Sequence, residues 1–152
     1  MWTRRGFATA GFSMLAVAAM PKAASAQLPK IDLKSLAHNP KMDECAKACA
    51  DCQLECDSCS HYCGKQLVMG STDHATTLAT CSDCADVCSV AAQIVSRSGP
   101  FSEVICVACA DACQKCAEAC ESFKEDEKMK KCAAACRKCE KACRGMMKTD
   151  KK

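Results

Sequence analysis

Residues 45–63 read CAKACADCQLECDSCSHYC, and the spacing of the cysteines in this stretch decides the fold. Its six cysteines follow one another at intervals that alternate strictly between four and three residues. That alternation is typical of the a/d seam of an α-helix that faces other helices, where most proteins place Leu, Ile or Val. The sequence therefore predicts a helix whose core-facing side consists of thiols.

Cysteine runs of the same register recur three more times along the chain. The steps inside each run are again three or four residues, and short turn signals separate the runs. Connections this short place neighbouring helices antiparallel. We expect an all-α protein, an antiparallel up-down-up-down four-helix bundle with a Cys-lined core. All 18 cysteines are candidate metal ligands: Cys45, Cys49, Cys52, Cys56, Cys59, Cys63, Cys81, Cys84, Cys88, Cys106, Cys109, Cys113, Cys116, Cys120, Cys132, Cys136, Cys139 and Cys143.

Capping and breaking residues mark the ends of these helices. Asn39 is suited to be an N-cap and Pro40 to be the first helical residue. Ser71 or Thr72 can cap a second helix, and the Ser-Gly-Pro break at residues 98–100 precedes a third. The charged stretch at residues 124–128 leads into a fourth. We expect helices from residue 40 to about 69, from 72 to about 97, from about 101 to 123, and from about 128 to 145.

The first 26 residues have the pattern of an export leader. They contain the adjacent Arg4 and Arg5, an apolar run over residues 8–20, and an A-x-A cleavage site at residues 24–26. Paired arginines predict the twin-arginine route and a periplasmic protein. The apolar run, roughly 13 residues, is short for a bilayer span, and an N-terminal membrane anchor is the alternative. The expected parts are a leader 1–26 cleaved after Ala26, a short segment 27–39, the bundle 40–147 and a basic tail 148–152.

Without the leader, the chain carries no net formal charge. Removing Arg4, Arg5 and Lys22 leaves 18 of the 21 basic residues, against 18 acidic ones. Charge therefore gives no case for binding nucleic acid, or membrane after leader cleavage. The chain also has no Ser/His/Asp set, phosphate loop or His/carboxylate group, so we expect no enzymatic activity.

Disulfides are one alternative explanation of the cysteines, because an exported chain with an even cysteine count often contains a disulfide framework. Within one helix, residues three or four apart have Cβ atoms about 5 to 6 Å apart, whereas a disulfide needs about 3.5 to 4.5 Å. Cross-helix disulfides stay open, and with them a disulfide-stabilised structural or redox protein. Inert buried cysteines would explain one or two positions, but not 18 on four seams.

Charge balance favours a monovalent soft metal ion. If every thiol ionises, the core holds 18 negative charges, and burying uncompensated charge is very costly. Zinc bound by four thiolates per ion would supply about four ions and leave a deficit near 10 charges. Cu(I), at about one ion per thiolate, would cancel the charge. We predict multiple Cu(I) ions per chain, with a zinc or cadmium thiolate-cluster buffer as the alternative. The C-x2-C-x2-C spacing of bacterial ferredoxins is absent.

Several motifs of this chain are found together in one known family. They are the run Cys45–Cys63, Ala85-Asp-Val-Cys88, Pro100-Phe101 with the run Cys106–Cys120, and the run Cys132–Cys143. Through them the chain resembles the bacterial copper storage proteins, a family of cysteine-rich four-helix bundles, over about residues 40–145. The resemblance implies a homotetramer that stores many Cu(I) ions inside each bundle, for copper homeostasis or detoxification. Some family members are cytosolic and others exported, and the leader places this chain with the exported ones. For a storage role, the expected protein partners are copper donor or recipient proteins.

Soft ligands continue the seams beyond the cysteines and fall at two ends of the expected bundle. One end holds His38, Met42 and Met146, and its apolar residues (Ala91, Ile94, Val95, Phe101, Val104 and Ile105) predict a plug. The other end holds His74 and Met129, with Met69 nearby and thinner apolar cover. We expect copper to enter there, with imidazole and thioether as first ligands. The additional candidate ligands are therefore His74, Met129, Met42, His38 and Met146, whereas His61 lies off the seam, at the surface or a subunit contact.

Overall fold

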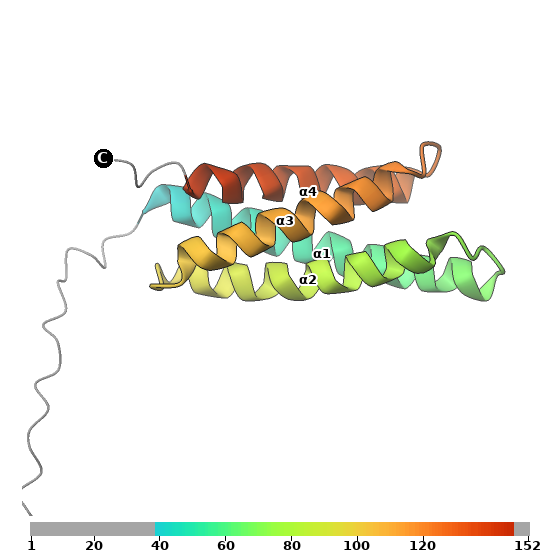
Figure 1. The fold of residues 1–152 in the computed structure, drawn as a ribbon, viewed down its shortest axis with the longest axis horizontal. Helices are drawn as coiled ribbons and strands as arrows, with labels where there is room; N and C mark the ends of the chain where they lie inside the picture. The colour runs from blue at the N-terminus through green and yellow to red at the C-terminus, as the bar shows by residue number, and fades with distance from the viewer. Residues whose placement is uncertain (1–38, 148–152) are drawn as a thin grey trace, which may run out of the picture. The chain divides into compact units, whose positions relative to one another are not determined.

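The structure, a computed structural model, describes residues 39–147, which form four α-helices (Figure 1). Successive helices run antiparallel. The helices α1 and α3 each pack against both α2 and α4. The predicted all-α up-down-up-down bundle is therefore confirmed. The predictions for residues 1–38, which include the leader and His38, and for the tail 148–152 lie outside the described residues. The helices are α1 (Pro40–Val68), α2 (His74–Ser96), α3 (Ser102–Glu121) and α4 (Glu127–Met146).

The start of α1 is the predicted one, but the start of α2 is not. Asn39 caps α1 by accepting a hydrogen bond from the backbone N–H of Lys41 at 3.1 Å. The prediction that Ser71 or Thr72 caps α2 is wrong, because α2 begins at His74. Gly70 reverses the chain with φ +95°, and the N–H groups of the next two residues bond back to the carbonyls of Gln66 and Gly70. These residues therefore complete the turn that ends α1.

Asp126 caps α4, and it does so at the end of the bundle where the α1–α2 and α3–α4 turns lie (Figure 1). Its carboxylate accepts hydrogen bonds from the N–H groups of Lys128 at 2.9 Å and Met129 at 3.2 Å. Two unpaired donors of the first helical turn are thereby satisfied. The cap also fixes the direction in which α4 leaves the turn, and so places Met129 on the core-facing side.

Small side chains fill the core between the helices. Alanines at positions such as 85, 110 and 117 lie buried beside the cysteines, and the largest fully buried side chains are Met129 and Val95. α2 has the length and apolar composition of a membrane-crossing helix, but in the bundle its cysteine stripe packs against the other helices. The bundle thus encloses a column of sulfur along its axis.

Candidate metal centre

All 18 thiols converge on the axis of the bundle. Each cysteine is at most 1% exposed, and each is a free thiol in the structure. Contacts between sulfurs of different helices measure 3.5 to 3.9 Å. A disulfide bond is about 2.05 Å long, so these are non-bonded neighbours. The four stripes predicted from spacing form one continuous column.

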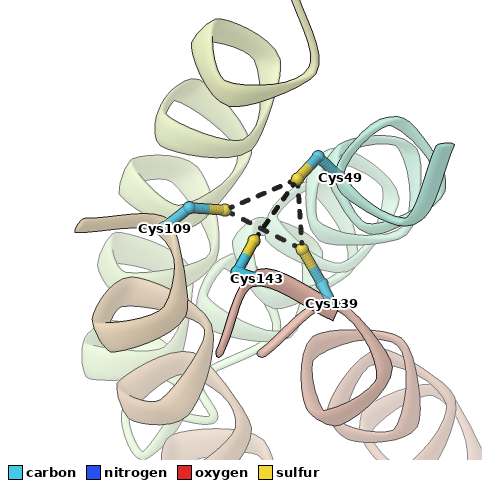
Figure 2. A group of neighbouring side chains, drawn as sticks. All are labelled: Cys49, Cys109, Cys139 and Cys143. Carbon is cyan, nitrogen blue, oxygen red and sulfur yellow. Dashed lines mark hydrogen bonds between the residues drawn. The ribbon is translucent and has the colours of Figure 1, made fainter. Parts of the chain in front are cut away.

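Figure 2 shows one of the four-thiol clusters in this column, formed by Cys49, Cys109, Cys139 and Cys143. Cys49 of α1 lies 3.8 Å from Cys109 of α3 and 3.6 Å from both α4 thiols, Cys139 and Cys143. Cys109 in turn lies 3.8 Å from Cys139. Three helices therefore aim their thiols at one point, and an ion there would contact all of them.

The clusters overlap, because several thiols belong to two of them. Cys52 and Cys84 are shared between two clusters, and so are Cys56, Cys132 and Cys136. A thiolate in such a position can bridge two ions, so the column offers a chain of adjoining sites instead of isolated ones. The further clusters include Cys52/Cys56/Cys84/Cys136, Cys52/Cys84/Cys88/Cys113, Cys56/Cys116/Cys132/Cys136 and Cys59/Cys81/Cys120/Cys132.

The spacing of the sulfurs suits a soft metal ion, whichever it is. Four thiolates about 2.3 Å from an ion, the Zn–S distance, form a tetrahedron with edges of about 3.8 Å. The observed contacts match that edge. Geometry alone therefore admits zinc as well as copper, and the choice between them depends on charge.

Most of the thiols hold their protons more tightly than a thiol in water. Burial is the main cause for Cys63, raising its pKa from 9.0 to about 12, and the neighbouring Cys59 adds to the shift. In the middle of the column, contact with Cys120 is the main reason that the pKa of Cys116 falls to about 6. Contacts with other thiols and burial raise the pKa of ten cysteines, whereas six cysteines have lowered pKa values.

The predicted plug is only partly present at the end where α2 meets α3. Ala91 and Val95 are fully buried there, and Met42 and Met146 pack against the core from α1 and α4. Ile94 and Ile105 are half-buried. Phe101 and Val104 were expected in the plug, but they are 67% and 68% exposed. The core-facing position at the start of α3 is taken by Ser102, which donates a hydrogen bond to the Gly99 carbonyl at 2.7 Å.

At the opposite end the structure brings both predicted ligands, His74 and Met129, to the column, and it leaves the nearby Met69 outside. Met129 is fully buried, and its Sδ lies 3.5 Å from Cys59 Sγ. His74 is 7% exposed and occupies the α2 stripe two turns before Cys81. Met69, by contrast, is 76% exposed. His61 is exposed on α1, in agreement with its predicted position off the seam.

His74 lies among aromatic side chains. Its ring stacks on Phe123 with centroids 4.4 Å apart and meets the edge of Tyr62 at 5.9 Å. Its Nδ1 is buried and has no hydrogen-bond partner among the residues that the structure describes. An unpaired buried nitrogen is costly, and a soft metal ion would satisfy it.

Sequence reasoning missed three residues at this end: Thr77, Tyr62 and Phe123. Thr77 is 2% exposed and continues the α2 stripe between His74 and Cys81, so counting by three and four would have found it. Tyr62 and Phe123 are half-buried against the core. Their signal was only that the chain after residue 26 has three aromatic residues.

Comparisons with known proteins agree with this geometry. A family model described as "Copper storage protein" matches residues 38–148. An uncharacterized cysteine-rich protein of Bacillus subtilis, YhjQ, is 33% identical over 84 residues, which is 55% of this chain and 76% of that protein. A cytosolic copper storage protein from Streptomyces lividans, solved with five coppers, is 30% identical with a TM-score of 0.65, over 70% of this chain and 92% of the other. The same organism's Ccsp loaded with 10 copper equivalents gives 28% identity and a TM-score of 0.65, over 82% and 92%.

Proposed function

The chain belongs to the copper storage protein family, and we propose that its thiol column holds copper as Cu(I), with neighbouring ions sharing bridging thiolates. The protein stores multiple copper ions through the cysteine clusters of a helix bundle, and it is not an enzyme. The observation that carries the bridging is the overlap of the clusters, whereas the charge of the core carries the choice of Cu(I). The thiols that each serve two sites are Cys52, Cys56, Cys84, Cys132 and Cys136.

The charge of the core supports Cu(I) over zinc. Within residues 39–147, the buried polar side chains are His74, Thr77 and Ser102, and no lysine or arginine is among them. Thiolates in the column therefore have no buried basic side chain to balance them, and the bound ions must supply the positive charge. One monovalent ion per thiolate balances the whole negative charge of the column, whereas four divalent ions would leave more than half of that negative charge uncompensated.

Copper exchanges at the His74 end in this account. His74 and Thr77 make the α2 stripe polar at this end, whereas Ala91 and Val95 make it apolar at the other. The thioether sulfur of Met129 on α4 lies 3.5 Å from the thiol sulfur of Cys59 on α1. Imidazole and thioether bind Cu(I) as neutral ligands, so they can pass the ion to the charged thiolates without holding it. Met42 and Met146 are candidate ligands at the far end, where both pack against the core.

The leader and the family resemblance extend the proposal to location and assembly. The paired arginines, the apolar run and the A-x-A site of residues 1–26 support export to the periplasm by the twin-arginine route. Replacing Arg4 and Arg5 with lysine should then retain the protein in the cytoplasm, as cell fractionation would show. A homotetramer follows from the resemblance, and copper donor or recipient proteins as partners follow from a storage role. Sedimentation equilibrium of the mature chain at four times the protomer mass would support the tetramer.

An anaerobic titration tests the storage chemistry. The reduced protein is titrated with Cu(I) against a competing chromophoric chelator, and the ions bound per chain are counted beside a thiol assay. We expect at least about half an ion per thiol, which zinc-type tetrathiolate sites cannot reach without extensive sharing. Saturation at about four ions would refute the bridged Cu(I) column. Few free thiols in the gently purified, metal-free protein would favour disulfides instead.

A further inference from the structure

We propose that the hydrogen bond between the Tyr62 hydroxyl and the Asp126 carboxylate is a latch. It holds an aromatic lid, formed by Tyr62, His74 and Phe123, over one end of the thiol column. The latch sets the rate at which copper enters and leaves, and not the number of ions bound. This inference rests on the proposed storage of copper and on exchange at the His74 end.

The lid draws one ring from each of three segments. Tyr62 comes from α1, His74 from the first turn of α2 and Phe123 from the turn between α3 and α4. Phe123 lies against the face of His74 with an interplanar angle of 21°, and Tyr62 meets it edge-on at 82°. Both Tyr62 and Phe123 pack against the buried core. The three rings therefore cover the column where the α1–α2 and α3–α4 turns come together.

The thiols behind this lid are sealed. Cys63 and Cys120 are the last cysteines of α1 and α3 at this end, and both are 0% exposed. Met129 is also 0% exposed. Since neither these two thiols nor the Met129 thioether reaches solvent, an ion can reach them from this end only when at least one ring moves aside.

The latch is the polar bond that holds the lid in place. The Tyr62 hydroxyl donates to Asp126 Oδ2 at 2.7 Å, while the other carboxylate oxygen accepts the two N–H groups that start α4. Asp126 is therefore fixed by its own helix and forms a rigid anchor. Rotation of the Tyr62 ring away from His74 breaks this bond, and a hydrogen bond to a charged group is stronger than one between neutral groups.

A surface hollow leads to the outer side of the latch. It has a volume of about 710 Å³ and is lined by Tyr62, Phe123 and Asp126 together with the neighbouring residues 122, 124, 125 and 127. Asp126 is flanked by Glu125 and Glu127, so the hollow carries negative charge next to the lid. A copper ion arriving from a carrier would thus meet the latch before it meets a thiol.

Removing one oxygen atom tests the latch. Tyr62→Phe deletes the hydroxyl and keeps the ring beside His74. We expect Cu(I) uptake from its bicinchoninate complex, followed anaerobically by stopped flow, to become at least about tenfold faster, which is the lower end of what one hydrogen bond to a charged group supplies. Release to excess chelator should speed up similarly, while the ions bound at saturation stay unchanged. Glu55→Gln is the matched control, because Glu55 also joins α1 to α4, through Lys128 and Lys131, without touching a lid ring.

The outcomes separate the latch from the storage function. Unchanged or slower exchange in Tyr62→Phe would overturn the latch, and so would equal acceleration in Glu55→Gln, which would show general loosening of the bundle. If Tyr62→Phe does not fold, Phe123→Leu serves instead, since it removes the stacked ring but keeps apolar bulk, and it must also speed exchange. Failure of the wild-type protein to bind copper would refute the storage proposal itself.

Discussion

Copper binding should release most of the thiol protons of the column. The metal-free core cannot hold 18 thiolates, because every cysteine is at most 1% exposed and uncompensated charge is costly in such a place. Each thiol that becomes a ligand must lose its proton. The size of the proton release therefore reports how many thiols were neutral beforehand and became ligands.

The pKa shifts of the thiols set the expected number of protons released per chain. Ten cysteines have raised pKa values and are protonated at pH 7, and the chain has 18 thiols in all. Saturation with Cu(I) should therefore release between ten and 18 protons per chain. Raised pKa values also mean that copper affinity falls as the pH falls.

A weakly buffered titration measures this release. The reduced metal-free protein is mixed anaerobically at pH 7 with Cu(I) in acetonitrile, which carries no proton of its own, and a pH indicator dye reports the protons. Denatured protein with blocked thiols is the control for background. Release well below ten protons per saturated chain would refute the reasoning, because it would mean that the thiols were already ionised or that many of them do not bind copper.

Further predictions concern the exchange end, the turns and pH. His74→Phe keeps an aromatic ring in the lid but removes the ligand nitrogens, so it should slow Cu(I) uptake severalfold and lower the capacity by at most one ion, and an unchanged stopped-flow rate would contradict exchange at this end. Met129→Leu should cost less than about 1.5 kcal/mol by denaturant unfolding, because the volume is kept, yet it should also slow uptake, which a packing role alone would not explain. Gly70→Ala should destabilise the protein by about 1 to 2 kcal/mol, because the backbone at Gly70 has φ +95°. Gly64→Ala should be neutral or stabilise the protein by up to about 1 kcal/mol, since the added Cβ would meet Leu78 at an ordinary contact distance of 3.4 Å. Thermal denaturation of the two variants tests this difference. The raised pKa of Cys63 favours the folded metal-free protein below pH 9.0, and this contribution should be lost as the pH rises towards about 12, as pH-dependent unfolding would show.

The fold could be read from the sequence because one rule governs the whole bundle. Steps of three and four residues place every cysteine on a core-facing stripe, and the structure buries all 18. The same counting correctly located Met129 and His74. The Asn39 cap was predictable as well, since it depends only on residues that are adjacent in the chain.

The errors and omissions arose where the pattern of residue types does not decide the outcome by itself. Phe101 is apolar and next to the α3 seam, yet it is exposed because Ser102 occupies the core-facing position. Ser71 is a good capping residue, but the turn after α1 uses its N–H to bond the Gln66 carbonyl. The contact of Tyr62 with Asp126 joins residues 64 positions apart, and no local pattern indicates such a pair.

X-ray absorption at the copper edge of the fully loaded protein reports the oxidation state of the copper and the identity of its nearest neighbours. We expect Cu(I) with sulfur as the dominant nearest neighbour, and copper–copper scattering at short distance because thiolates bridge adjoining sites. Cu(II), or a nearest-neighbour shell made mainly of nitrogen and oxygen, would contradict it. Sulfur-bound copper without a copper neighbour would refute the shared clusters built on Cys52, Cys56, Cys84, Cys132 and Cys136.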